Sequence, residues 1–300
     1  MGHDGPDHKP SPYDAAVATT GFDEDGVLVL RQAVTDRDLL AAVRADHDHR
    51  WPRQDRVQDG WRRSAAIRRL AADPGLRRAA AAALGGAVVP FQTLNLRRGT
   101  GQPLHADTVH FDTLPHGGVC GAWVALEDVG SGQGPVGFVR GSHRRPPVVP
   151  TGSGALAAHE RLESERWAGT EPEPFLARAG DVLVWHGDLV HGGLPVLDPG
   201  STRWSQVTHY LREGAVYVTP ARSDPRRGEW WVREGVVDVA TGRAVPQLLD
   251  GRPLRLVRIG GGRSTLLRMG DPPPGVWTRA ASAARGGFRG LRQRVASRRP

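Results

Sequence analysis

The pattern of apolar and polar positions divides the chain into a helical part followed by a β-rich part. Residues 26–31 form a short apolar run that predicts a first strand. An apolar stripe at helical spacing predicts a helix from Thr35 to about His49. A second helical region is expected over residues 64–84, interrupted near Pro74. These helices would form a layer that precedes the strands.

From Val88 onward the pattern changes to short β-like runs separated by clusters of Gly, Pro and Asp. The expected strands are Val88–Arg97, Gln102–Phe111, Gly118–Leu126, Val136–Val139, Asp181–His186, Leu189–Val196 and Thr202–Glu213. Many short strands at this spacing are typical of a sandwich or a jelly-roll barrel. The expected fold class is therefore mainly β, with flanking N-terminal α-helices.

The same pattern predicts the domain organisation. Residues 1–19 are polar and contain several prolines, so we expect them to be disordered. One jelly-roll domain is expected over residues 20–220, and residues 146–178 within it form an insert or lid. We expect residues 221–260 to form a C-terminal β extension and residues 261–300 to form a basic, flexible tail.

Composition narrows the class of protein. The 300 residues are 39% hydrophobic and 24% charged, as expected for a globular protein. The longest apolar stretch, residues 79–89, is short for a membrane span and contains glycines. Cys120 is the only cysteine, which excludes an internal disulfide framework. With no secretory signal pattern at the N-terminus, we expect a cytoplasmic protein without a transmembrane segment.

The formal net charge of +8 is concentrated towards the C-terminus, which is rich in arginine. A basic segment of this kind can bind nucleic acid or an anionic membrane surface. We interpret it as a solvated tail, because the interleaved aromatic residues of a base-stacking platform are missing, with only Trp277 and Phe288 there. The expected partner is a small molecule rather than a nucleic acid.

The motif His105-Ala106-Asp107 carries the strongest chemical signal. On a strand, residues two apart share a face, so this imidazole and this carboxylate would point the same way. His191 lies on a later predicted strand and is followed by two glycines, which leave space beside it. Two imidazoles and one carboxylate are the ligands of a mononuclear ferrous centre with open coordination positions. The three residues therefore predict a metal site.

Two rivals compete for these roles. His110-Phe111-Asp112 has the same spacing as the first motif, but it lies towards a turn and has the opposite strand parity. His186 ends its predicted strand beside a turn, whereas His191 lies within the next one. We favour His105, Asp107 and His191 as the ligands.

Arg203 follows His191 after a predicted turn at Asp198-Pro199-Gly200. If that turn closes a hairpin, Arg203 lies roughly 10–13 Å along from the point opposite His191. This span fits a metal-chelated five-carbon diacid whose far carboxylate pairs with the guanidinium. An ordinary surface arginine is the alternative.

Residues from about Gly21 to Tyr217 resemble the phytanoyl-CoA dioxygenase family of iron(II)- and 2-oxoglutarate-dependent oxygenases. The matching stretches are Gly26–Arg31, Phe91–Asn95, Gln102–Asp107, Gly121–Val129, Gly134-Pro135, Gly141–His143, Gly180-Asp181, His191–Gly193 and Thr202–Trp204. The resemblance implies a double-stranded β-helix, a cupin-like jelly roll. It also implies that His105, Asp107 and His191 are the catalytic, iron-binding triad and that Arg203 binds 2-oxoglutarate.

Further contacts with the cosubstrate are implied for Trp123, and for Thr93 and Asn95, which share one face of the preceding strand. Core packing is the alternative for Trp123. The implied cofactors are Fe(II), 2-oxoglutarate as cosubstrate and O2. The sequence departs from the family pattern where Arg140 replaces a proline, and where Gly193 stands in place of a Ser or Thr that helps bind the cosubstrate in some relatives.

We therefore expect a dioxygenase that hydroxylates an unactivated C–H bond of a small molecule, in specialised metabolism, or oxidises it by desaturation or ring closure. Asp107 favours oxygenation, since related halogenases carry Ala or Gly at this position. Two alternatives stay open. One is a metal-binding jelly roll without catalysis, and the other is an oxygenase that acts on nucleic acid through its basic C-terminus.

Overall fold

The computed structural model describes residues 20–150, 154–249, 251–254 and 266–268. The expectations for residues 1–19 and for most of the basic tail lie outside these residues. Within the described part, no helix is both long and apolar enough to span a membrane.

The helices and short 3₁₀ turns are distributed along the whole described chain. The α-helices are α2 (Thr20–Asp25), α3 (Arg37–Arg50), α4 (Ala65–Ala71), α5 (Pro74–Leu84) and α6 (Ala155–Arg166). The 3₁₀ turns are η1 (Gly60–Arg62), η2 (Asp107–Val109), η3 (Ser142–Arg144), η4 (Pro220–Arg222) and η5 (Pro225–Arg227).

The N-terminal helices begin where the sequence provides caps. The side chains of Asp36, Ser64 and Asp73 each accept a hydrogen bond from the backbone N–H three residues on, which satisfies a donor that the first helical turn leaves free. Pro74 occupies the first position of α5, where its missing N–H costs nothing. The predicted interruption of the second helical region is therefore the boundary between α4 and α5.

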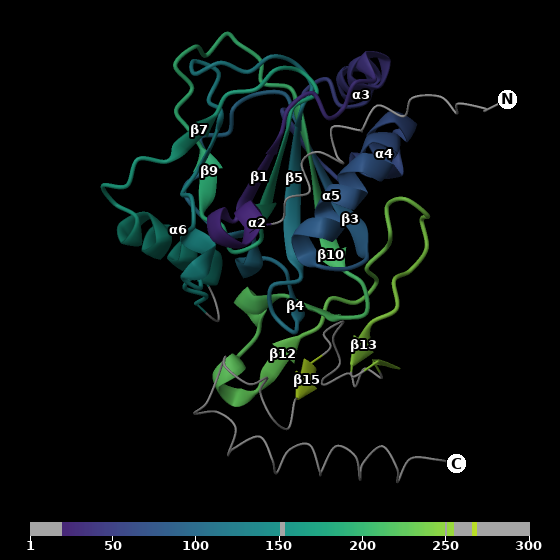
Figure 1. Cartoon of the computed structure of the whole chain (residues 1–300), viewed down its shortest axis with the longest axis vertical. Coiled ribbons are helices and arrows are strands. Elements are labelled where there is room, and N and C mark those ends of the chain that lie inside the picture. The colour runs from purple at the N-terminus through teal and green to yellow at the C-terminus, as the bar shows by residue number, and fades with distance from the viewer. Residues whose placement is uncertain (1–19, 151–153, 250, 255–265, 269–300) are drawn as a thin grey trace, which may run out of the picture.

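Two facing antiparallel sheets form the centre of the molecule (Figure 1). The strands before the C-terminal extension are β1 (Val27–Leu30), β2 (Arg56–Gln58), β3 (Val88–Leu96), β4 (Asp112–Leu114), β5 (Val119–Ala125), β6 (Val136–Phe138), β7 (Glu173–Phe175), β8 (Val182–His186), β9 (His191–Gly193), β10 (Ser205–Arg212) and β11 (Val216–Val218). The larger sheet has the order β1-β8-β5-β10-β3-β2 and the smaller one β7-β6-β9.

The two faces of the larger sheet serve different purposes. Ala122 and Val124 of β5, with Val184 of β8, belong to the core beneath α3, α4 and α5. The alternate residues Trp123 and Trp185 turn towards the smaller sheet and pack in a second core. The interior between the two sheets is thus walled by aromatic and aliphatic side chains, and the candidate site lies there.

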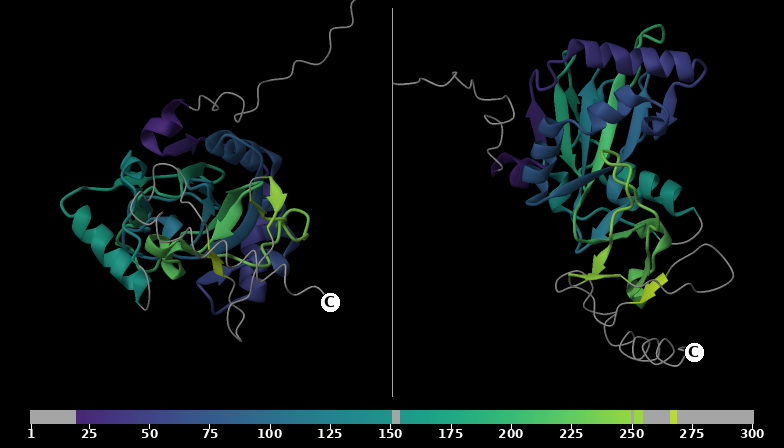
Figure 2. Two further views of the ribbon diagram at one scale, coloured as in Figure 1. Left: turned by 90° about the horizontal axis from the view of Figure 1, so that it is seen from below. Right: turned by 90° about the vertical axis from the view of Figure 1, so that its right-hand side faces the viewer.

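The strands of the C-terminal extension form short two-stranded sheets at the end of the molecule away from α3 (Figure 2). β12 (Glu229–Trp231) pairs with β15 (Leu266–Arg268), and β13 (Leu248–Leu249) pairs with β14 (Arg252–Pro253). β11 pairs with β4 and so connects the extension to the jelly roll. The predicted domain limits at 20–220 and 221–260 stay predictions.

The predicted insert is fastened to the jelly roll through α6. The buried His159 accepts a hydrogen bond from the backbone N–H of Ala106 at 3.1 Å and donates one to the carbonyl of Val148. The buried Glu163 accepts the N–H of Val148 at 2.7 Å and the indole N–H of Trp167 at 3.0 Å. One side of α6 therefore contacts the chain between the first two predicted metal ligands.

Two strand predictions were wrong. Residues 102–111 do not form a strand: His105 makes an isolated bridge to His191, and the chain then turns into η2 at Asp107. Pro103 lacks the N–H that a continuous ladder needs, which favours this break. The predicted hairpin after His191 does not form either, because β9 pairs with β6 whereas β10 lies between β5 and β3 in the other sheet.

Candidate metal centre

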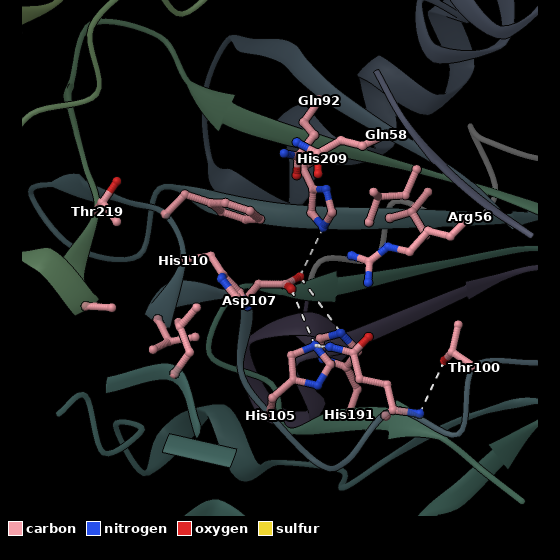
Figure 3. Close-up of a pocket in the computed structure, with 18 of the residues that line it drawn as sticks. Arg56, Gln58, Gln92, Thr100, His105, Asp107, His110, His191, His209 and Thr219 are labelled. Atoms are coloured by element: carbon pink, nitrogen blue, oxygen red, sulfur yellow. Dashed lines mark hydrogen bonds and ion pairs between the residues drawn. The ribbon is translucent and has the colours of Figure 1, made fainter. Parts of the chain in front are cut away.

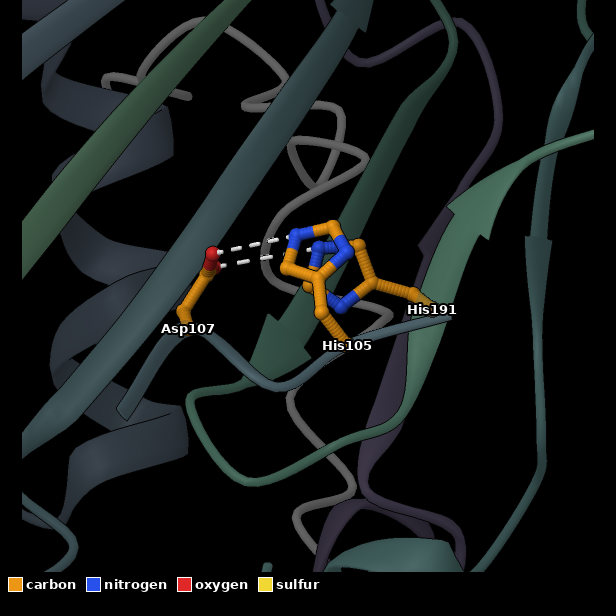
Figure 4. A group of neighbouring side chains, drawn as sticks. All are labelled: His105, Asp107 and His191. Carbon is orange, nitrogen blue, oxygen red and sulfur yellow. Dashed lines mark ion pairs between the residues drawn. The ribbon is translucent and has the colours of Figure 1, made fainter. Parts of the chain in front are cut away.

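The structure brings the three predicted ligands together between the two sheets (Figure 4). His105 Nε2 lies 3.8 Å from Asp107 Oδ1, and His191 Nε2 lies 3.9 Å from Asp107 Oδ2. One donor atom from each residue lies within 4.8 Å of the others. All three side chains are buried. They meet through a bridge and a turn rather than along one strand face, so the strand parity argument was wrong, and metal binding by these three residues stays a prediction.

Both imidazoles are oriented by backbone carbonyls. The Nδ1–H of His105 donates to Pro103 at 2.8 Å, and the Nδ1–H of His191 donates to Leu189 at 2.9 Å. These bonds favour the tautomer in which each Nε2 is an acceptor on the side of Asp107. Burial, followed by the proximity of His191, lowers the pKa of His105 to about 3. His105 is therefore neutral at physiological pH, as a metal ligand must be.

Asp107 is held by two side chains from the larger sheet. The indole N–H of Trp185 donates to its Oδ2 at 2.8 Å, and His209 Nε2 lies 3.3 Å from the same oxygen (Figure 3). Burial raises the pKa of Asp107, but His209 and His191 outweigh it and hold this pKa well below its usual range. The carboxylate is thus charged, with Oδ1 facing His105 and Oδ2 facing His191.

Sequence reasoning missed His209 as a site residue. It lies on β10 in alternation with Arg203, Ser205 and Val207, and residues an even number apart on a strand share a face. This parity was the signal that could have identified it.

The donor set fits a ferrous ion. Two imidazole nitrogens and one carboxylate oxygen on one side leave the remaining coordination positions open. The side-chain amide of Gln102 donates to His105 Nε2 at 3.2 Å, on the atom that a metal would use. A metal bound here replaces that hydrogen bond.

Arg203 lies in the same cavity, with 2% of its surface exposed. One Nη donates to the carbonyl of Gly134 at 2.8 Å, and Nε has no hydrogen-bond partner. Among the described residues, no carboxylate pairs with it, and burial lowers its pKa to about 10. A buried cation without a counter-charge is costly. The arrangement is therefore suited to an anionic ligand.

The residues predicted to contact the cosubstrate lie on different faces. Trp123 lines the cavity, its Nε1 has no hydrogen-bond partner, and its ring lies 6.0 Å from the Arg203 guanidinium. Thr93 and Asn95 face away from the cavity, and the amide of Asn95 donates to Gln206 on the helix side of the sheet. This placement argues against cosubstrate contacts for these two. The cavity-facing residues of β3 include Gln92 (Figure 3).

The rival ligands have other partners. Asp112 is bonded to His116, which also contacts Asp188 at 2.7 Å. The ring of His186 lies tilted against that of His143, with centroids 5.4 Å apart, and burial lowers the pKa of His186 to about 4. In the described part of the chain, His105, Asp107 and His191 are the one group of three such side chains with a metal-binding arrangement.

The cavity around the triad has a volume of about 840 Å³. Arg203 and Trp123 are among the residues that line it. Its wall also includes the first residues of α6 and, from the C-terminal extension, Ala221, Trp231 and Arg233. Both the insert and the extension therefore shape the space in which a substrate would lie.

A model of the phytanoyl-CoA dioxygenase (PhyH) family matches residues 22–204 of the chain. "Phytanoyl-CoA dioxygenase domain-containing protein 1" of Mus musculus is 34% identical over 93 residues. That alignment covers 29% of this chain and 31% of the mouse protein, so the match spans less than a third of the relative's length.

Solved structures share the fold at low sequence identity. The epimerase SnoN, solved with Fe3+, alpha ketoglutarate and nogalamycin RO, superposes with a TM-score of 0.59 at 24% identity, covering 87% of this chain and 100% of SnoN. The alpha ketoglutarate-dependent carbocyclase SnoK from nogalamycin biosynthesis gives 0.56 at 20%, covering 67% of this chain and 85% of SnoK. These likenesses confirm the predicted mainly β, jelly-roll fold class.

Proposed function

Because the chain belongs to the phytanoyl-CoA dioxygenase family, we propose that it is an iron(II)- and 2-oxoglutarate-dependent dioxygenase that hydroxylates an unactivated C–H bond of a small molecule. The overall reaction is R–H + 2-oxoglutarate + O2 → R–OH + succinate + CO2. Bound iron(II) would supply the reductive activation of O2, coupled to the oxidative decarboxylation of the cosubstrate.

His105, Asp107 and His191 would hold the iron, since their donor atoms converge and both imidazoles are oriented by backbone carbonyls. Trp185 and His209 would keep the Asp107 carboxylate in place through its second oxygen. The retained carboxylate supports oxygenation over halogenation, because it fills the position that a halide would need. Burial of the triad would exclude bulk water from the reacting atoms.

Arg203 is the observation that carries the proposal. Its buried guanidinium has an unused donor and no acidic partner in the described part of the chain, and it shares the cavity of the triad. A five-carbon diacid chelated by the metal would place its far carboxylate there and satisfy that donor by a charge-assisted bond. A metal-binding protein without catalysis has no need of such a residue.

The domain organisation is part of the same proposal. Residues 20–220 would form the catalytic unit, residues 146–178 its cover, and residues 221–260 an extension that closes the far end of the cavity. The small-molecule substrate would enter this cavity and lie beside the triad.

Reaction type needs its own experiment, since the related structures SnoN and SnoK are described as an epimerase and a carbocyclase. Purified protein with Fe(II), 2-oxoglutarate and 18O2 is incubated with a metabolite extract, and the products are analysed by mass spectrometry. Hydroxylation predicts a product that is heavier than its substrate by one 18O atom. A product lighter by two hydrogens, or one with unchanged mass, contradicts hydroxylation and indicates desaturation, ring closure or epimerisation.

A further inference from the structure

The cavity wall beyond the triad is rich in arginine. Arg56, Arg222 and Arg233 line it in addition to Arg203, whereas Asp107 and one glutamate are the carboxylates that line it. Four guanidinium groups against these two carboxylates leave a net charge of +2 when the histidines are neutral. The charges of iron(II) and dianionic 2-oxoglutarate cancel, so this excess of positive charge would remain after both have bound.

Arg233 is held in place by aromatic rings. Its guanidinium lies over Phe91 and Phe111, 5.7 and 5.6 Å from their ring centres, and one Nη donates to the carbonyl of His110 at 3.2 Å. Burial lowers the pKa of Arg233; the charge of Asp59 opposes this shift, and the nearby charge of Arg222 adds to it. An arginine that stacks on aromatic faces keeps a fixed orientation, with donors left for a carboxylate or a phosphate.

Arg222 and Arg56 approach the same space from other elements. Arg222 belongs to η4, and its guanidinium lies 5.7 Å from the ring centre of Trp231. Arg56 points from β2 into the cavity towards the triad (Figure 3). Within the described residues, the three arginines form no ion pair shorter than 4.0 Å with a carboxylate, and Asp59 acts on Arg233 from a greater distance. Arg222 and Arg233 also lie beyond residues 22–204, which match the family model.

We propose that Arg222 and Arg233, together with Arg56, form a subsite for an anionic group of the substrate. The substrate would then be an organic anion, with a carboxylate or a phosphate group placed away from the carbon that is oxidised. This inference rests on the proposed function, since it assigns the substrate class of the same cavity. Two guanidinium groups in the same cavity repel each other when no anion is bound. An anion that accepts hydrogen bonds from both relieves this repulsion.

Binding of small organic anions tests the subsite. Protein loaded with Fe(II) and 2-oxoglutarate under nitrogen is titrated by calorimetry with phenyl phosphate, benzoate and the neutral benzyl alcohol. We expect at least one anion to bind, benzyl alcohol to bind more weakly, and the anion affinity to fall as salt is added. A preference for phenyl phosphate assigns a phosphate group, and a preference for benzoate assigns a carboxylate.

Arginine variants locate the binding. Loss of one charge-assisted hydrogen bond predicts that R222Q and R233Q each weaken anion binding by about tenfold or more. R233K, which keeps the charge, should recover part of it. R69Q is the matched control, because Arg69 is exposed on α4 and pairs with Asp36 outside the cavity. Thermal melts verify that each variant is folded. If R233Q does not fold, R222Q alone carries the test, since Arg222 is exposed and its replacement should not disturb the core.

The subsite is refuted if neither anion binds, if benzyl alcohol binds as tightly as the anions, or if R222Q and R233Q bind them like the wild-type protein. The affinity for 2-oxoglutarate separates this failure from a failure of the proposed function. When 2-oxoglutarate binds and depends on Arg203, failure of the anion titrations overturns the subsite alone. When 2-oxoglutarate does not bind, the proposed function itself is wrong.

Discussion

Replacing Trp185 with phenylalanine would remove one hydrogen bond from the metal centre while retaining an aromatic ring. The indole nitrogen lies 2.8 Å from Asp107 Oδ2, and the ring lies tilted against that of His191, with centroids 4.6 Å apart. Phenylalanine preserves most of the packing but leaves His209, at 3.3 Å, as the nearest remaining contact of Oδ2. The substitution therefore tests whether the orientation of Asp107 sets the affinity for the metal.

The expected magnitude follows from the burial of the carboxylate. A hydrogen bond to a charged group contributes about 1.5–3 kcal/mol, and about 1.4 kcal/mol corresponds to a tenfold change in affinity. Loss of such an outer contact weakens metal binding by about 10- to 100-fold in known sites. Because His209 at 3.3 Å still holds the same oxygen, we expect W185F to lie near the lower end of that range.

Calorimetric titration with Mn(II), a redox-stable substitute for ferrous iron, measures the effect. W61F is the matched control, because Trp61 is also buried and its indole donates to the carboxylate of Asp59 at 3.2 Å, but it is not among the residues that line the cavity. W61F should lose stability and keep its affinity for Mn(II). If W185F binds Mn(II) as tightly as the wild-type protein, or if W61F weakens binding to the same extent, the reasoning is refuted.

Three further substitutions give separable outcomes. R203Q should raise the KM for 2-oxoglutarate by about tenfold or more and R203K by less, which steady-state kinetics measures; equal KM values would exclude the clamp. H159L leaves the buried N–H of Ala106 without its acceptor and should lower the free energy of unfolding by about 1–3 kcal/mol in urea titrations. Unchanged stability would contradict an anchoring role for α6. Although burial disfavours the cation, hydrogen bonds to Asp112 and Asp188 raise the pKa of His116 to about 11. The stabilising contribution of protonated His116 is therefore complete below about pH 6.5 and is lost as the pH rises from there towards about 11. The difference in unfolding free energy between the wild-type protein and H116Q should therefore shrink between about pH 6 and pH 10, and a constant difference would contradict this.

Much of the fold and the triad could be predicted from the sequence because their signals are local. Helix caps such as Asp36 and Ser64 are read directly from residue type and position. The ligand set also follows from residue type, since His105, Asp107 and His191 offer a donor combination that few other functions require.

The faces of the strands could not be predicted with the same certainty. β3 is covered on both sides, by helices on one and the cavity on the other, so its polar and apolar residues do not alternate in the usual way. The polar residues Thr93 and Asn95 are buried on the helix side, whereas Leu94 faces the cavity. Hydrophobicity therefore gave no sign of which face was inward, and it gave none for His209 either.

The path of the chain around Arg203 shows a second limit. A turn containing Pro199 and Gly200 looks the same in sequence whether it closes a hairpin or carries the chain from one sheet to the other. Only the pairing of β10 with β3 and β5 decides between these, and that pairing involves residues about a hundred positions apart. The contribution of the C-terminal extension to the cavity is non-local for the same reason.

Oxygen-dependent formation of succinate tests the central claim most directly. Wild-type protein, R203Q and D107A are each incubated with Fe(II) and 2-oxoglutarate, with and without O2, and succinate is quantified in the presence of a metabolite extract. We expect the wild-type protein to form succinate only when both Fe(II) and O2 are present, R203Q to form much less at low 2-oxoglutarate, and D107A to form none above background. Wild-type protein that binds iron but forms no succinate, or equal succinate from all three proteins, would contradict the account.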